Sequence, residues 1–76
     1  MSELQWFPWG RNSYTTTWPP KSGRWYRLVP GLDGWGIYRK LPGRSGLQFW
    51  QQLPKMRDTH AKQAAALLVT MGGGSE

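Results

Sequence analysis

The chain has 76 residues, enough for one small domain, and it contains no cysteine, which excludes a disulfide scaffold and a thiolate metal site. Six Trp, three Tyr and two Phe are the expected substitute in the core, since each large ring buries on the order of 150–250 Å². Ten Lys and Arg against four Asp and Glu give a formal net charge of +6, which favours an anionic partner such as nucleic acid.

Residues 1–23 contain prolines, a glycine and an asparagine that interrupt any helix. The segment is nevertheless too apolar to lie free in solvent, so we expect an N-terminal arm packed on the domain. Within it, residues 13–18 are rich in β-branched and aromatic side chains and are a candidate for an extra edge strand. The apolar side chains of the arm are Leu4, Trp6, Phe7 and Trp9.

Three strands are predicted next, over residues 24–29, 35–41 and 47–53, because each run alternates apolar and polar side chains. The Pro-Gly and Asp-Gly pairs within 30–34 and the Pro-Gly pair within 42–46 predict the two hairpin turns between them.

The alternation also assigns the faces of this sheet. We expect the core face to hold Trp25, Val29, Trp35, Ile37, Leu41, Leu47, Phe49 and Leu53. On that assignment, Phe49→Ala is expected to cost roughly 3–5 kcal/mol. The other face of the sheet collects Arg24, Tyr26, Tyr38, Lys40, Gln48, Trp50 and Gln52.

A helix is predicted over residues 58–71, begun by Asp58 or Thr59 and ended by the glycines that open a flexible tail, 72–76. Its apolar stripe is Ala61, Ala64, Ala65, Leu68 and Met71. The predicted fold is therefore α+β: a three-stranded antiparallel sheet with one C-terminal helix packed on one face. The β-β-β-α domain spans 24–71, and the Trp- and Pro-rich arm lies on it.

Aromatic rings interleaved with cations and amides suit a nucleic-acid surface. Rings stack on unpaired bases, Arg and amide side chains bond base edges, and cations neutralise phosphates. We therefore predict a small nucleic-acid-binding protein, with DNA favoured over RNA, and with Arg44 at the second hairpin touching phosphate. One structural alternative stays open: the arm covers Tyr26, Tyr38 and Trp50, which then form a second small core.

An enzyme is not predicted, because His60 is the single histidine and no pair of carboxylates is suited to acid–base chemistry. No metal-ligating cluster or phosphate loop is present in the sequence, so we expect no cofactor. The rival hypothesis is a protein-interaction module, or a small inhibitor of phage or mobile-element type, that uses the aromatic and basic patch against an acidic protein. No apolar run approaches a membrane span, so no membrane partner is expected and the cytoplasm is the expected compartment.

The strand-strand-strand-helix order, with Gly34-Trp35-Gly36-Ile37-Tyr38 in the middle strand and Ala61-Lys62-Gln63-Ala64-Ala65 on the helix, resembles the AP2-type and integrase arm-binding DNA-binding domains. The resemblance covers about residues 24–71 and implies a sheet face that enters the major groove. The run His60-Ala61-Lys62-Gln63-Ala64-Ala65-Ala66 also resembles the final helix of a double-stranded-RNA-binding domain.

Overall fold

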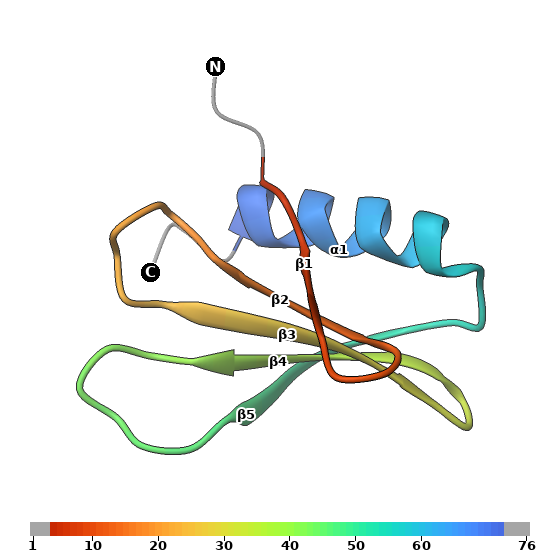
Figure 1. Cartoon of the computed structure of the whole chain (residues 1–76), viewed down its shortest axis with the longest axis horizontal. Coiled ribbons are helices and arrows are strands. Elements are labelled where there is room, and N and C mark those ends of the chain that lie inside the picture. The colour runs from red at the N-terminus through yellow and green to blue at the C-terminus, as the bar shows by residue number, and fades with distance from the viewer. Residues whose placement is uncertain (1–3, 73–76) are drawn as a thin grey trace.

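The computed structural model describes residues 4–72, and within them the chain forms five strands followed by one helix. The strands form one antiparallel sheet in chain order, and α1 lies along one side of it (Figure 1). The α+β class, the antiparallel sheet and the C-terminal helix are confirmed. The expected number of strands is wrong, because there are five and not three. The elements are β1 (Phe7–Trp9), β2 (Ser13–Thr17), β3 (Trp25–Gly31), β4 (Gly34–Lys40), β5 (Gln48–Leu53) and α1 (Asp58–Gly72).

The two additional strands come from the expected N-terminal arm: β2 coincides with the candidate strand at 13–18, but β1 pairs on its outer side, so β2 is not at the edge. β2 pairs with β3 from Tyr14 to Thr17, and β1 pairs with the first three residues of β2. Gly10 forms part of the tight turn between β1 and β2 with a φ of 77°, a conformation that glycine adopts without steric cost. The segment that precedes β1 lies against the helix and not in the sheet (Figure 1). There the Trp6 indole Nε1–H donates to the Lys62 carbonyl oxygen at 2.9 Å.

Directly opposed residues of an antiparallel pair project to the same face of the sheet. The pairings align Phe7, Thr15, Arg27, Tyr38 and Phe49 in one row across all five strands, on the side turned away from α1. We call this side the open face; its residues are Phe7, Trp9, Ser13, Thr15, Thr17, Trp25, Arg27, Val29, Gly31, Gly34, Gly36, Tyr38, Lys40, Phe49 and Gln52.

The core lies between the other face of the sheet and α1. Tyr26, Leu28 and Ile37 are fully buried there, and Trp35 and Leu53 are nearly so. From the helix, Ala61, Ala65 and Val69 complete the cluster, and partly buried Leu4, Trp6, Tyr14, Trp18, Trp50, Met56, Ala64 and Leu68 pack around it. The Trp35 indole Nε1–H donates to the Met56 carbonyl oxygen at 2.9 Å, which fixes the segment leading into the helix.

The expected faces of β3 are reversed. Tyr26, placed in the sequence-based interpretation on the ligand face, is fully buried, whereas Trp25 is 46% exposed and Val29 lies beside it on the open face. The physical reason is Arg27, which shares a face with Trp25 and Val29. Burying that face would have buried a guanidinium group, at a high desolvation cost.

A β-bulge explains why the expected faces of β5 are wrong as well. Ile37 opposes Gln51 and Tyr38 opposes Phe49, so Trp50 is the extra residue of β5. The bulge reverses the alternation, and Phe49 and Leu53 therefore lie on opposite faces although they are four residues apart. Leu53 is buried as expected, but Phe49 is 57% exposed and Leu47 is exposed too.

The helix begins at Asp58 as expected and extends to Gly72. Its buried stripe is Ala61, Ala65 and Val69, which are each four residues apart, so the expected stripe is rotated by a fraction of a turn. Met71, expected in the core, is 74% exposed. The remainder of the expected tail, residues 73–76, lies outside the described residues.

Gly34 is required by the sheet itself. Its φ is 134°, and a Cβ built there would lie 2.0 Å from the Leu53 carbonyl oxygen. We expect Gly34→Ala to prevent folding at ambient temperature, because backbone of two strands would have to separate. Gly43→Ala is the matched control: φ is 78° but nothing lies within 4 Å of the added carbon, so the cost should be roughly 1–2 kcal/mol. Circular dichroism melts of both variants test this, and equal melting temperatures would contradict it.

The two faces predict opposite effects of removing an aromatic ring. Tyr26→Ala should cost about 3–5 kcal/mol and leave so small a domain largely unfolded. Phe49→Ala should cost only about 1 kcal/mol, the scale of its edge contact with the Tyr38 ring, whose centroid is 5.6 Å away. Urea denaturation of both variants measures the difference. A Phe49→Ala variant less stable than Tyr26→Ala would show that the faces are misassigned.

Candidate nucleic-acid interface

Arg27 stands at the centre of the open face, on the middle strand of the sheet. Its guanidinium carbon lies 3.7 Å from the centroid of the Trp9 ring, which is a close cation–π stack. The stack joins β3 to β1 diagonally across β2, where Thr15 opposes Arg27, Ser13 opposes Trp9, and both have short side chains. A cation backed by an aromatic ring keeps its outer side available to an anion or a base.

The Nε–H of Arg27 is buried and has no hydrogen-bond acceptor among the described residues. Leaving a buried donor unpaired costs about 1–3 kcal/mol, and more for a charged group. The fold alone gives no reason for an arginine here, since an apolar side chain of similar length would stack on Trp9 without that cost. The position therefore merits a functional explanation.

Tyr38 and Phe49 form the second aromatic group, on β4 and β5. Their rings meet edge to face, with centroids 5.6 Å apart and planes at 77°. The Tyr38 ring leans along the sheet over Gly36, where an added Cβ would lie 3.2 Å from the ring carbon Cε1. The glycine thus lets the Tyr38 ring lie close to the sheet surface beside the exposed Phe49.

A third group lies at the end of the sheet nearest the β4–β5 hairpin. Trp25 opposes Lys40 across the β3–β4 pair and opposes Thr17 across the β2–β3 pair. The Trp25 ring is 46% exposed, and Lys40 is half-buried beside it. A ring and an ammonium group are therefore presented together on one face.

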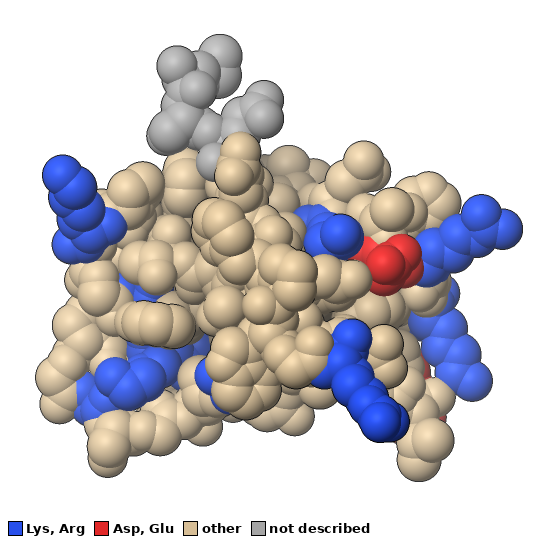
Figure 2. Space-filling view, in the orientation of Figure 1, with Lys and Arg blue, Asp and Glu red and all other residues tan. Residues whose placement is uncertain are grey.

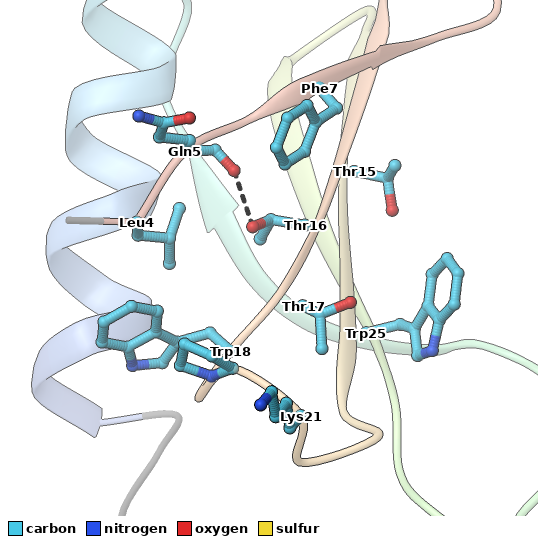
Figure 3. Close-up of a pocket in the computed structure, with 10 residues that line it drawn as sticks. Leu4, Gln5, Phe7, Thr15, Thr16, Thr17, Trp18, Lys21 and Trp25 are labelled. Carbon is cyan, nitrogen blue, oxygen red and sulfur yellow. Dashed lines mark hydrogen bonds between the residues drawn. The ribbon is translucent and has the colours of Figure 1, made fainter. Parts of the chain in front are cut away.

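A groove of about 490 Å³ follows the edge of β2, where β1 turns away toward the helix. Phe7, Thr15, Thr17 and Trp25 are among its lining residues, and the Thr16 hydroxyl donates to the Gln5 carbonyl oxygen at 2.7 Å (Figure 3). Leu4 and Trp18 line its other side, toward α1, and Lys21 lies at its lower end (Figure 3). The groove therefore offers rings, hydroxyl groups and one cation.

The predicted site residues divide between the two faces. Tyr38, Lys40 and Gln52 are on the open face, and Arg44 is exposed in the β4–β5 hairpin. The Gln52 amide nitrogen donates to the Leu53 carbonyl oxygen at 3.0 Å.

The remaining predicted residues lie elsewhere. Tyr26 is in the core, and Gln48 opposes Arg39, which places it on the α1 side. Trp50 is half-buried on that side, with its ring centroid 5.5 Å from that of Tyr26. Arg24 is half-buried just before β3, and its carbonyl oxygen accepts from the Trp18 N–H.

The structure does not show the alternative in which the N-terminal arm covers Tyr26, Tyr38 and Trp50 as a second small core. Tyr26 and Trp50 are covered from the α1 side of the sheet. Trp9 of the arm lies over Arg27, and it remains 50% exposed. Phe7 is 57% exposed, so the arm adds rings to the open face instead of closing it.

The sequence-based interpretation missed Trp9, Trp25, Arg27 and Phe49 as surface residues. Arg27 had a usable signal, because a cation alternating with Trp25 and Val29 marks the exposed side of a strand. Phe49 had none, since the bulge beside it depends on pairing with β4. Trp9 likewise needed the pairing of β1, a strand of three residues, to place it.

Positively charged side chains are spread over the surface of the protein (Figure 2). Lys and Arg side chains stand at both ends of the molecule, with a group of them near the β4–β5 hairpin (Figure 2). The acidic surface visible in the same view lies near the start of α1 (Figure 2). There the Tyr14 hydroxyl donates to Asp58 Oδ2 at 3.1 Å, and Lys62 Nζ lies 4.5 Å from the Tyr14 ring centroid.

Folding changes the acidity of the Tyr14 hydroxyl at this corner. The pKa of the Tyr14 hydroxyl is raised from its ordinary value of 10.0, first by desolvation and then by the hydrogen bond and charge of Asp58. A raised pKa means that the protonated donor is the form favoured by folding. Its contribution is therefore fully present below pH 10 and declines only at more alkaline pH.

Two other kinds of site were sought in residues 4–72. No three His, Asp or Glu side chains in this part of the chain gather closely enough to hold a metal ion. No helix in it has the length and apolar character needed to cross a bilayer.

No known protein family, curated protein or solved structure matches this chain. The resemblances to sheet-based DNA-binding domains and to the RNA-binding helix therefore stay predictions, and the site has to be interpreted from its own chemistry.

Proposed function

We propose that the protein is a small non-enzymatic nucleic-acid-binding domain that acts in the cytoplasm and binds its ligand on the open face. The observation that carries the proposal is Arg27, stacked at 3.7 Å on an exposed tryptophan in the middle of that face. The resemblance of residues 24–71 to sheet-based DNA-binding domains makes DNA the first polymer to test.

The charge of the chain supports an anionic polymer as ligand. The net charge is +6, and the cations include Arg27 and Lys40 on the open face and Arg44 in the adjoining hairpin. Such cations displace the counterions condensed on phosphates, which provides most of the affinity of non-specific binding. Lys40 and Arg44 are suited to phosphate, since each projects near one end of the face.

The aromatic content of the face supports nucleic acid over a simple polyanion. Trp9, Trp25 and Phe49 are each about half exposed, although such rings are usually buried in a core. Arg27 is positioned to bond a base edge or a phosphate with its terminal nitrogens while its inner side rests on Trp9.

The second candidate is a protein-interaction module that binds an acidic partner. Half-exposed Trp and Phe beside Arg also favour this function, because Trp, Tyr and Arg dominate the energetics of protein interfaces. Salt separates the two. A nucleic-acid binder that contacts several phosphates loses affinity linearly in log salt, with a slope of about −0.7 to −0.9 per phosphate contact. An interface between proteins that is carried by apolar side chains does not show this linear loss of affinity with salt.

Arg27→Met tests the function directly. Methionine keeps an extended chain that packs against Trp9, and it removes the buried unpaired donor, so the melting temperature should be unchanged or higher. Binding to nucleic acid should weaken about tenfold, on the scale of ~1–3 kcal/mol for a lost Arg contact, and the salt slope should become shallower. Fluorescence anisotropy with a labelled oligonucleotide at several salt concentrations measures both.

Lys55→Met is the matched control, because it removes one charge from the exposed connection between β5 and α1. It should weaken binding far less than Arg27→Met. If both variants lose the same affinity, net charge alone drives binding and the open face has no special role. If the parent protein binds no nucleic acid even at low salt, the proposed function is wrong.

A further inference from the structure

The exposed rings of the open face point to the form of the nucleic acid. In a duplex the flat faces of the bases are stacked inside the helix, and only their edges are accessible in the grooves. In a single strand the flat faces are accessible and stack on protein rings. Resting on the proposed function, we infer that the open face binds single-stranded nucleic acid, with bases stacked on its aromatic side chains.

The first support is the number and spread of the rings. Phe7 and Phe49 are each 57% exposed, Trp9 is 50% exposed and Trp25 is 46% exposed. They stand on β1, β3 and β5, so they span the whole width of the sheet. Neighbouring strands lie about 4.8 Å apart, which separates the outer rings by on the order of 19 Å, room for several successive nucleotides.

The second support is the space between the rings. Thr15 and Thr17 separate Phe7 from Trp25 with short side chains, and these four residues are part of the groove of about 490 Å³ (Figure 3). Flat bases need such gaps in order to lie against a ring.

The third support is that the open face has few side chains able to hydrogen-bond the base edges of a duplex. A sheet in the major groove reads base edges with amide and guanidinium groups. On the open face, the Gln52 amide nitrogen already donates to the Leu53 carbonyl oxygen, and Arg27 is the one guanidinium group among the described residues of that face. The predicted amide Gln48 and the ring of Trp50 are on the α1 side of the sheet.

The test compares three labelled ligands of about 16 nucleotides, the upper end of site sizes for compact single-strand-binding domains. They are a mixed-sequence DNA strand, the RNA strand of the same sequence, and the DNA strand annealed to its complement. The full chain should bind at least one single strand about tenfold or more tighter than the duplex at equal salt. Preference for DNA or for RNA supports the inference in either case and identifies the polymer.

Two outcomes distinguish a failure of the single-strand inference from a failure of the proposed nucleic-acid binding. Equal or tighter binding of the duplex overturns the single-strand inference and leaves nucleic-acid binding intact. No binding of any ligand at low salt overturns both.

Ring stacking itself is tested at Trp25. Trp25→Leu keeps apolar bulk but removes the ring, and it should weaken single-strand binding about 5- to 150-fold. Trp25→Phe should restore most of the affinity, and Leu67→Ala, an exposed apolar residue on α1, should leave it unchanged. Thermal melts verify that each variant folds. If Trp25→Leu does not fold, Phe49→Leu takes its place in the test. Affinity that is equal for the Phe and Leu variants would overturn stacking as the binding mode.

Discussion

The contact of α1 with the sheet through Ala61, Ala65 and Val69 governs the rest of this molecule. Small side chains let the helix lie close to Tyr26, Leu28 and Ile37, so one short helix closes the core of a very small domain. Six of the eleven aromatic residues of the chain lie in this core or pack against it: Tyr26, Trp35, Trp6, Tyr14, Trp18 and Trp50. The other five rings, those of Phe7, Trp9, Trp25, Tyr38 and Phe49, lie on the open face of the sheet.

The N-terminal segment supports both sides of this arrangement at once. Leu4 and Trp6 pack with the core, and the Trp6 indole holds the Lys62 carbonyl of the helix. One residue later the chain becomes β1, whose Phe7 and Trp9 lie on the open face. The same short segment therefore closes the core with Leu4 and the Trp6 ring and adds the rings of Phe7 and Trp9 to the open face.

The sequence predicted the elements better than the faces. Residues 24–53 were expected to hold three strands and two turns, and α1 was expected from Asp58; both follow from local patterns of turn residues and periodicity. The faces of β3 were wrong although Arg27 signalled them. The faces of β5 depend on the bulge at Trp50, which arises from pairing with β4 and leaves no local signal. Of the eight predicted site residues, only Tyr38, Lys40 and Gln52 therefore lie on the open face.

Arg27 connects stability to function in this account. Its buried, unpaired Nε–H is a cost within the described fold, and its stack on Trp9 positions the guanidinium group at the centre of the open face. Natural proteins commonly depart from local rules of stability at functional sites. The open face as a whole fits that pattern, since half-exposed rings also give up burial that a purely structural domain would use.

The indole N–H signals of the six tryptophans provide the most direct test of the central claim. Proton–nitrogen correlation spectra would be recorded while an oligonucleotide is added to the labelled protein. The open face as binding surface predicts that Trp9 and Trp25 shift, while Trp6 and Trp35, whose Nε1–H groups donate to the Lys62 and Met56 carbonyl oxygens, stay in place. Shifts at Trp6 and Trp35 with Trp9 and Trp25 unchanged would contradict the account.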